Sequence, residues 1–339
     1  MARATQWAPV PMSEIAGRPR LLFMGVNAIF SCRHLKAVAA TAPVCCVVET
    51  VRPLGRLKRL ERRLLPSRLA RTARAVGAHY HEIPYRDPNA LLAIMRDEAP
   101  DLVIVASLGR LLRQDEIAAP RLGILNVHPS LLPSYRGSSP SFWQLRDGVS
   151  ESGVTVHLID PGMDTGPILA QTRFALPFGA TPEDLLALQL AHGPGVLVGA
   201  VRDMLAGTAR LAPQPETSPT RPARGLIPAD AAGGVWLEAD LDEAWRLLRA
   251  VGPILNWPPA RRRDLGWLAF ATERSAGVSP VPPGRIGRDE RGSFLAHPQG
   301  RIHLRWRWLP RAWLLALRRK GSPGGGVIAL ETAAGLSGL

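Results

Sequence analysis

The sequence predicts an α/β domain with a parallel β-sheet, followed by a small β-barrel. Apolar, β-branched runs of strand length alternate with helix-compatible stretches in the first part of the chain, which is typical of a parallel sheet with helices on both faces. A stretch rich in proline, serine and threonine then has the composition of a linker. Short strand-like runs separated by glycine and proline follow, and they favour a small barrel, with oligonucleotide-binding (OB) folds among the candidates.

These changes in composition set the expected domain boundaries. We expect the α/β domain over residues 18–208, a linker over 209–226, the barrel-like domain over 227–320 and a flexible, glycine-rich tail over 321–339. The chain has 339 residues, of which 46% are hydrophobic, so two domains can each bury a core.

The expected strands of the α/β domain are short apolar runs. They cover residues 21–24, 44–48, 79–83, 102–106, 124–128, 153–159 and 168–174. Helices are expected over residues 31–40, 89–98 and 182–205. Thr181 is a suitable N-cap for the last helix, because Pro182 takes the first helical position and acidic residues follow in the first turn.

In the second domain, Asp240 to Glu243 resembles a capping box that opens a helix ending near Gly252. The expected strands cover residues 267–272, 284–288, 292–296 and 302–308. The basic, tryptophan-rich segment 306–320 could suit a membrane surface. It follows a strand-like run, however, and we expect it to pack on its own domain.

The chain is strongly basic, with 42 Lys and Arg against 28 Asp and Glu and a formal charge of +14. This favours an acidic partner such as nucleic acid, a folate tail or phosphates, although an arginine bias can also arise from codon usage. The three cysteines are too few and too close together for a disulfide framework or a zinc site. There is neither a signal-peptide core nor an unbroken apolar run of roughly 18 residues. We therefore expect a cytoplasmic, monomeric protein without a membrane partner.

Several common motifs are missing from the sequence. Gly25 stands alone, without the three-glycine pattern of dinucleotide folds, and there is no Walker loop, HExxH motif or paired cysteine ligand set. Ser130 lacks the surrounding glycines of a nucleophile elbow. His79 and His81 share a strand face, but such pairs are more often surface residues than metal ligands. The sequence therefore predicts a site without a covalent nucleophile and without a metal.

Three polar residues stand out around the expected strand over 124–128. Asn126 and His128 alternate, so both side chains face the same side of the strand, and Asp164 lies in a loop between two later strands. Each could serve a local turn or backbone group if taken alone. Together they suit direct transfer of a small acyl group to an amine, because an amide and a protonated imidazole can stabilise an oxyanion while a carboxylate holds the imidazole charged and relays protons.

Four separated segments in this region resemble the folate-dependent formyltransferases. They are Asn126-Val127-His128, Ser130 to Pro133, Arg136-Gly137 and Asp164-Thr165-Gly166, in that order and spacing. The resemblance implies a Rossmann-like sheet, N10-formyltetrahydrofolate as formyl donor, and Asn126, His128 and Asp164 as catalytic residues. It also implies a set of donor-binding residues: Arg110, Leu111, Leu112, Ser130, Leu131, Leu132, Pro133 and Asp160.

Within that family, the chain is most similar to the methionyl-tRNA formyltransferase branch, which carries a C-terminal barrel-like domain. The basic segment after the second strand resembles that branch's tRNA-contacting loop, which implies Arg52 and Arg56 as acceptor-binding residues. Arg136, from the Arg136-Gly137 pair of the family pattern, is expected to bind the acceptor as well. Residues 52–74 carry nine basic residues and one acid, which fits either RNA binding or a solvated helix.

Two other functions stay open from the sequence. Tyr135, Ser138 and Ser139 depart from the tRNA branch and are closer to formyltransferases of sugar amines, so an amino-sugar nucleotide is a second candidate acceptor. A non-catalytic RNA-binding protein on the same fold is a third interpretation, but such a protein has no need of the three polar residues.

Overall fold

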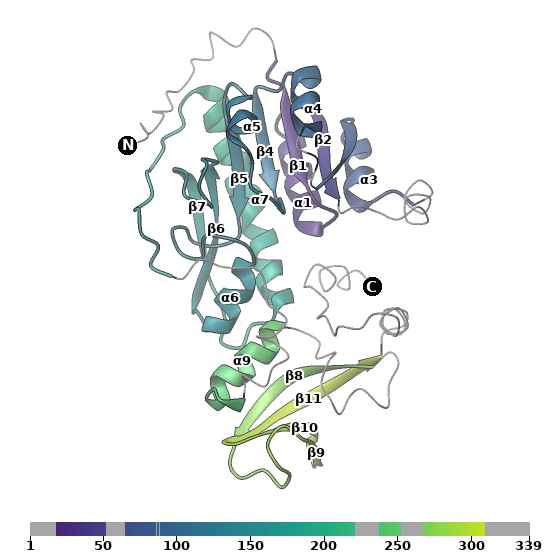
Figure 1. Cartoon of the computed structure of the whole chain (residues 1–339), viewed down its shortest axis with the longest axis vertical. Helices are drawn as coiled ribbons and strands as arrows, with labels where there is room; N and C mark the ends of the chain where they lie inside the picture. Colours follow the sequence, from purple (N-terminus) through teal and green to yellow (C-terminus); the bar gives the residue numbers. More distant parts are fainter. Residues whose placement is uncertain are drawn as a thin grey trace. The chain divides into compact units, whose positions relative to one another are not determined.

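The computed structural model describes residues 18–51, 65–85, 87, 89–220, 237–251 and 267–308 (Figure 1). The chain forms two compact units. Unit 1 comprises Met1–Ser138, Glu151–Phe174 and Leu186–Ala223, and unit 2 comprises Ser139–Ser150, Ala175–Leu185 and Arg224–Leu339. The predicted domain boundaries stay a prediction. The predicted tail and most of the basic, tryptophan-rich segment lie outside the described residues.

Unit 1 is built on a seven-stranded sheet in the order β3-β2-β1-β4-β5-β6-β7. The strands are β1 (Leu21–Gly25), β2 (Val44–Val51), β3 (His79–Pro84), β4 (Leu102–Ala106), β5 (Ile124–His128), β6 (Glu151–Leu158) and β7 (Ile168–Ala175). Strands β1 to β5 pair in parallel, whereas β6 pairs antiparallel to β5. The predicted parallel α/β sheet is thus confirmed, with an antiparallel addition at one side.

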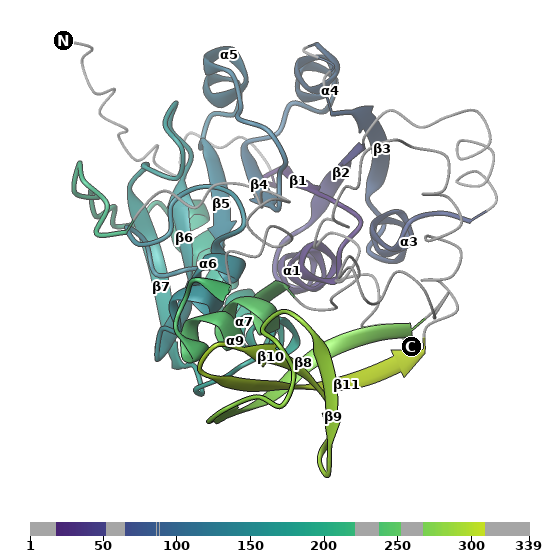
Figure 2. The ribbon, with the colours of Figure 1, turned by 60° about the horizontal axis from the view of Figure 1, so that its bottom comes forward.

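Helices cover both faces of this sheet (Figure 2). On one face lie α1 (Ile29–Ala39) and α3 (Arg68–Ala75), and on the other lie α4 (Ala90–Glu98) and α5 (Gln114–Ala118). Strands β1 and β4 are buried at every position, which explains why they read as continuous apolar runs. Side chains of β1, β2, β4 and Ile124 of β5 form one core with α4 and Leu112.

The long helix α7 (Pro182–Ala206) begins as predicted, because the Thr181 hydroxyl accepts from the amide of Asp184 and the Asp184 carboxylate accepts from the amide of Thr181. Within the described residues, α7 is long and apolar enough to cross a membrane. A helix in the core of a folded domain meets the same two criteria, so this finding does not establish a membrane span.

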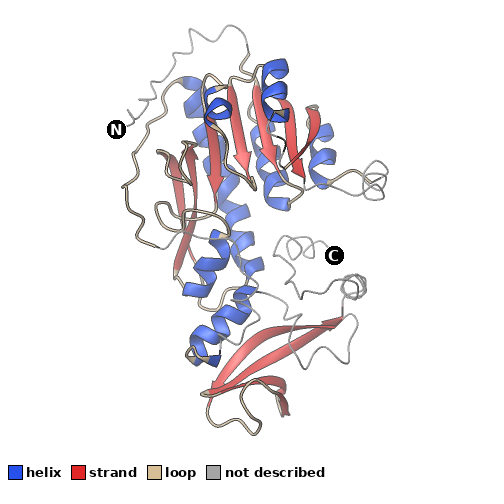
Figure 3. Ribbon diagram, viewed as in Figure 1, coloured by secondary structure: helices blue, strands red, loops and turns tan. Residues whose placement is uncertain are grey.

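Unit 2 contains α6 (Pro140–Asp147), α9 (Leu241–Val251) and a four-stranded antiparallel sheet in the order β8-β11-β10-β9 (Figure 3). The strands are β8 (Trp267–Ala276), β9 (Ile286–Asp289), β10 (Gly292–His297) and β11 (Gly300–Trp308). Asp240 caps α9 as predicted, accepting from the amide of Glu243 at 2.7 Å. An antiparallel sheet of this size is consistent with the predicted barrel-like domain.

Candidate active site

Strand β5 carries two polar side chains on one face. Ile124 packs in the core on the α4 and α5 side, so by alternation Asn126 and His128 face that side as well. His128 is buried and Asn126 half-buried. The interior position of β5, between β4 and β6, fixes both side chains on a rigid element.

Asp164 joins these two residues, as the sequence predicted. The loop after β6 folds back over β5, and the Asp164 carboxylate accepts a hydrogen bond from Asn126 Nδ2 at 3.2 Å. Its other oxygen lies 3.5 Å from His128 Nδ1. Asp164 has a φ of 55°, a left-handed conformation that is uncommon for a residue other than glycine.

His157 is a fourth member of this group, and sequence reasoning missed it. It lies on β6 directly opposite Asn126, and its Nε2 atom is 3.0 Å from Asn126 Nδ2 and 3.5 Å from an Asp164 oxygen. Its Nδ1 atom lies 2.8 Å from the Leu158 carbonyl, which can only accept, so Nδ1 carries the hydrogen. Because Asn126 Nδ2 can only donate, His157 Nε2 accepts from it. We call Asn126, His128, His157 and Asp164 the β5 cluster.

The His128 ring is held in one tautomer. Its Nε2–H donates to the Tyr135 carbonyl at 2.9 Å, which leaves Nδ1 facing Asp164. Burial lowers the pKa of His128, although Asp164 and the Tyr135 carbonyl act in the opposite direction. The resting imidazole is therefore neutral, rather than the protonated imidazole considered for the oxyanion, and it can take up a proton at Nδ1 beside the carboxylate.

Asp164 stays ionised despite its burial. Burial alone would raise the pKa of this carboxyl, but His128, His157 and the Gly137 amide, which donates to Asp164 at 2.8 Å, together lower its pKa to about 2. The Asp164 side chain is 16% exposed, compared with 5% for His128 and 1% for His157. The carboxylate is thus the charged group of the β5 cluster that an incoming substrate meets first.

The segment after β5 is fixed by hydrogen bonds to neighbouring strands. The Thr155 hydroxyl donates to the Ser130 carbonyl at 2.7 Å and accepts from the Leu132 amide at 3.1 Å. Gln171 Nε2 donates to the Leu132 carbonyl at 3.0 Å. These bonds fix the backbone of the predicted donor residues Ser130, Leu131, Leu132 and Pro133. The Ser130 hydroxyl donates to the Ser134 carbonyl.

The other predicted donor residues lie in two loops. Arg110 makes a bidentate contact with the buried carboxylate of Glu116, at 2.6 and 2.7 Å, so its guanidinium stabilises α5. Leu111 is 56% exposed, and Leu112 packs into the core. Asp160 accepts from the Thr165 hydroxyl at 2.7 Å and from the Gly162 amide, and so orders the loop that carries Asp164.

Of the predicted acceptor-binding residues, Arg52 and Arg56 lie outside the described residues. Arg136 is buried, and its guanidinium donates to the Gln214 side chain and to the carbonyls of Pro215 and Glu216. Its predicted contact with the acceptor stays a prediction. Its observed partners all lie in the segment predicted to be a linker, which runs along unit 1 and bonds to Ile168 through Ala212.

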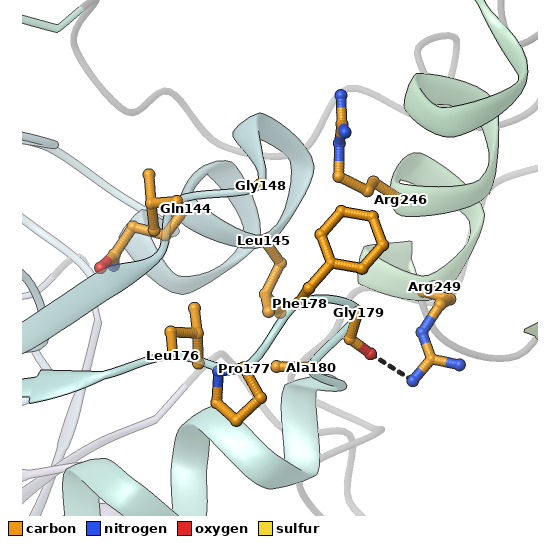
Figure 4. Close-up of a pocket in the computed structure, with 11 residues that line it drawn as sticks. Gln144, Leu145, Gly148, Leu176, Pro177, Phe178, Gly179, Ala180, Arg246 and Arg249 are labelled. Atoms are coloured by element: carbon orange, nitrogen blue, oxygen red, sulfur yellow. Dashed lines mark hydrogen bonds between the residues drawn. The ribbon is translucent and has the colours of Figure 1, made fainter.

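A separate pocket lies within unit 2, between α6, α9 and residues 176–180 (Figure 4). Its lining includes Phe178, Arg246 and Arg249, and Arg249 donates to the Gly179 carbonyl (Figure 4). The pocket contains no member of the β5 cluster and no predicted donor residue. The chemistry suggested by the sequence therefore belongs to unit 1.

Residues 26–201 match the formyl transferase family. The methionyl-tRNA formyltransferase of Halorhodospira halophila is 32% identical over 274 residues, which are 80% of this chain and 82% of that protein. The methionyl-tRNA formyltransferase of Bordetella bronchiseptica is 35% identical over 314 residues, 85% of this chain and 91% of that protein. The N-formyltransferase from Helicobacter canadensis, solved with folinic acid and dTDP-3-aminofucose, superposes with a TM-score of 0.53 at 16% identity, covering 83% of this chain and 97% of that chain. At that identity the likeness concerns the fold.

Proposed function

Because this chain belongs to the formyl transferase family, we propose that it transfers the formyl group of N10-formyltetrahydrofolate to the amino group of methionyl-tRNA. The observation that carries this proposal is the β5 cluster, in which an amide, a neutral imidazole and an ionised carboxylate share one buried site. The relatives that act on methionyl-tRNA match across both units rather than the catalytic part alone, which supports this acceptor.

The donor site proposed here uses the residues inferred from the family. Arg110 to Leu112, Ser130 to Pro133 and Asp160 would border the folate, which supplies the formyl group. Two exposed apolar side chains suit a flat ring: Leu111 and Met163, of which Met163 lies in the loop that also carries Asp160 and Asp164. The Arg110 contact with Glu116 and the Asp160 contact with Thr165 would keep these segments ordered before the donor binds.

The β5 cluster can support the transfer by moving one proton and stabilising charge. The neutral acceptor amine attacks the formyl carbon and must then lose a proton. His128 can take that proton at Nδ1, and the Asp164 carboxylate, 3.5 Å away, stabilises the resulting imidazolium. The imidazolium can then return the proton to N10 of the donor as the bond between N10 and the formyl carbon breaks, so that tetrahydrofolate leaves and His128 is neutral again. Asn126 is the proposed donor to the developing oxyanion. Since its Nδ2 hydrogens face His157 and Asp164 in this structure, one of these bonds must exchange.

The tRNA acceptor is supported by the basic segment that includes Arg52 and Arg56. Arg136, which follows His128 closely in the sequence, is the third proposed acceptor-binding residue. A second candidate acceptor, an amino-sugar nucleotide, is favoured by Tyr135, Ser138 and Ser139, which depart from the tRNA branch. We further propose that the protein is a cytoplasmic monomer that needs neither a metal nor a membrane.

A panel of acceptors tests this proposal. The protein is offered N10-formyltetrahydrofolate with methionyl-tRNA, an amino-sugar nucleotide or glycinamide ribotide, and the formylated product is measured. We expect product on methionyl-tRNA, with initiator-tRNA binding that weakens steeply with salt and less steeply, by about one unit of slope per lost phosphate contact, when Arg52 or Arg56 becomes Ala. Product on the amino sugar alone would transfer the assignment to the second candidate.

A further inference from the structure

Gln214 connects two parts of the active-site unit that sequence reasoning treated separately. Its Nε2 atom donates to the main-chain carbonyls of Asp164 and Gly166, at 3.0 and 2.6 Å. Its Oε1 atom accepts from Arg136 Nε and Nη2, at 3.1 and 2.9 Å. One carboxamide therefore binds the loop of the proposed catalytic carboxylate on one side and a buried guanidinium on the other.

Arg136 also acts on Asp164 from a second direction. The next residue, Gly137, donates its amide to the Asp164 carboxylate at 2.8 Å. The guanidinium of Arg136 fixes the main chain at this point, because it is bonded to Gln214, Pro215 and Glu216. The backbone of Asp164 is thus held through Gln214, and its side chain through Gly137.

This support matters because the geometry of Asp164 is demanding. Its φ of 55° is a conformation that side-chain-bearing residues rarely adopt without surrounding contacts that enforce it. Its carboxylate must also face Asn126 and His128 at the same time. A small rotation of the loop would break one of these contacts, and misplacement by about 1 Å can cost an enzyme about 10²-fold in rate.

We propose that Gln214 and Arg136 are positioning residues that hold Asp164 in its catalytic geometry, with Gln214 as the central link. This inference rests on the proposed function only for its kinetic consequences. Gln214 itself acts through hydrogen bonds to the loop and touches no reacting atom. The same contacts give Arg136 a role that differs from binding the acceptor.

Two substitutions of Gln214 distinguish the role of its amide nitrogen from that of its amide oxygen. Gln214→Leu removes both sets of bonds. Gln214→Glu keeps an oxygen that Arg136 can bind but cannot donate to the carbonyls of Asp164 and Gly166. We expect both variants to lose about 10- to 100-fold in kcat, with the KM for the formyl donor changed by less than about threefold.

Arg136→Lys distinguishes positioning from acceptor binding, because lysine keeps the charge but lacks the planar fork. A positioning role lowers kcat, whereas an acceptor-binding role raises the acceptor KM with kcat unchanged. Ser218→Ala is the matched control: the Ser218 hydroxyl donates to the Pro133 carbonyl, so the variant removes another side-chain bond between the same segment and the residues after β5. We expect its kcat to stay within about twofold of wild type.

A measurement without substrate keeps this test independent of the proposed function. Hydrogen exchange of the Gly137 amide should speed up by about tenfold in Gln214→Leu, since its bond to Asp164 is loosened, and should be unchanged in Ser218→Ala. Wild-type exchange and kcat in Gln214→Leu would overturn the inference. Equal losses in Gln214→Leu and Ser218→Ala would also overturn it, because they would indicate general undocking of the segment. A wild-type protein that forms no product would contradict only the proposed function.

Discussion

Two groups of histidine and carboxylate side chains in unit 1 look alike by distance and differ in almost everything else. In the β5 cluster, His128 and Asp164 lie 3.5 Å apart on an interior strand. At the edge strand β3, His79 lies 2.9 Å from Glu98, which also binds Arg20 at 3.0 Å. We call Arg20, His79, His81 and Glu98 the β3 cluster. The closer pair is in the group with no proposed catalytic role.

The exposure of the histidine rings and the kind of partner separate the two groups, since both carboxylates are largely buried. The His79 side chain is 74% exposed, so its contact with Glu98 is screened by water and contributes little to stability. In the β5 cluster the rings are buried, and two N–H groups fixed by the fold, from Asn126 and Gly137, hold the carboxylate. A short distance between opposite charges is therefore a poor indicator of function. Preorganised neutral donors around a buried charge are a better one.

The largest expected effect on kcat comes from removing the charge of Asp164. Asp164→Asn should lower kcat for formyl transfer by about 10² to 10⁴, because it removes the charge that stabilises a protonated His128. Glu98→Gln, the matched change in the β3 cluster, should alter kcat by less than about twofold, although it lowers stability because a buried carboxylate loses its charge-assisted bonds to Arg20 and His79. Steady-state kinetics and urea unfolding measure both. Similar kinetic losses in the two variants would remove the distinction between the clusters.

A smaller loss is expected for the amide. Asn126→Ala should lower kcat by about 10² to 10³, since one side chain donates to both His157 and Asp164 and is the proposed oxyanion donor. Asn89→Ala is the control, because Asn89 precedes α4 and its side chain makes no capping bond. Single-turnover rates with both variants decide the matter: a normal rate in Asn126→Ala would exclude the amide from the chemical step.

A buried histidine that lies in neither cluster, His34, should make the stability of the protein depend on pH. His34 donates at Nδ1 to the Phe30 carbonyl, and burial lowers its pKa from 6.5 to about 4. The unfolded chain then binds more protons between these values, so the contribution of His34 is complete above pH 6.5 and is lost as the pH falls towards 4, by up to about 3 kcal/mol in total. The stability contributed by ionised Asp164 is lost over a lower pH range, as the pH falls from about 4 to about 2.

Urea unfolding of wild type and His34→Gln at pH 7.5, 6.5 and 5.5 measures this difference. The stability of the wild type should fall more steeply over this range than that of the variant, by up to about 1.4 kcal/mol for each pH unit below 6.5. Parallel curves would show that His34 does not titrate as its burial requires.

The smallest expected effect concerns metal. The ligand atoms of Cys46, His81 and Glu98 lie within 4.8 Å of one another, next to the exposed ring of His79. Burial raises the pKa of the Cys46 thiol to about 12, which opposes formation of the thiolate that a metal requires. Dialysis against a chelator should therefore change kcat by less than about twofold. Stoichiometric zinc in the purified protein, lost in Cys46→Ser, would give the β3 cluster a function of its own.

The sequence predicts the parts of the site whose residues lie close together along the chain, and it predicts contacts between distant segments poorly. Asn126 and His128 follow from strand alternation alone. Asp164 was singled out as a carboxylate in a loop between two strands, and the resemblance supported its role, but its contacts with Asn126 and His128 depend on the loop after β6 folding back over β5, which cannot be read from spacing. His157 was missed because a single histidine in an apolar strand gives no signal until its register with Asn126 is known.

Gln214 was missed for a related reason. It stands in a segment rich in proline and serine, whose composition predicts a linker but says nothing about the surface along which it lies. Among the described helices, α5 and α6 were not predicted, since each is at most eight residues long. Helix α3 lies in the basic segment for which a solvated helix was one of two interpretations. Long elements with regular patterns were predicted well, while short elements and long-range contacts depend on the fold.

The composition of unit 2 has a consequence for synthesis of the chain. Helix α6 lies early in the sequence, yet it packs on α9, which the ribosome produces much later. Until α9 emerges, the apolar side of α6 has no permanent cover, and the nascent chain has to avoid pairing it with other proteins. A shortened gene that ends at the predicted linker would make that temporary exposure permanent. We therefore expect both units to be expressed together if either is to be soluble.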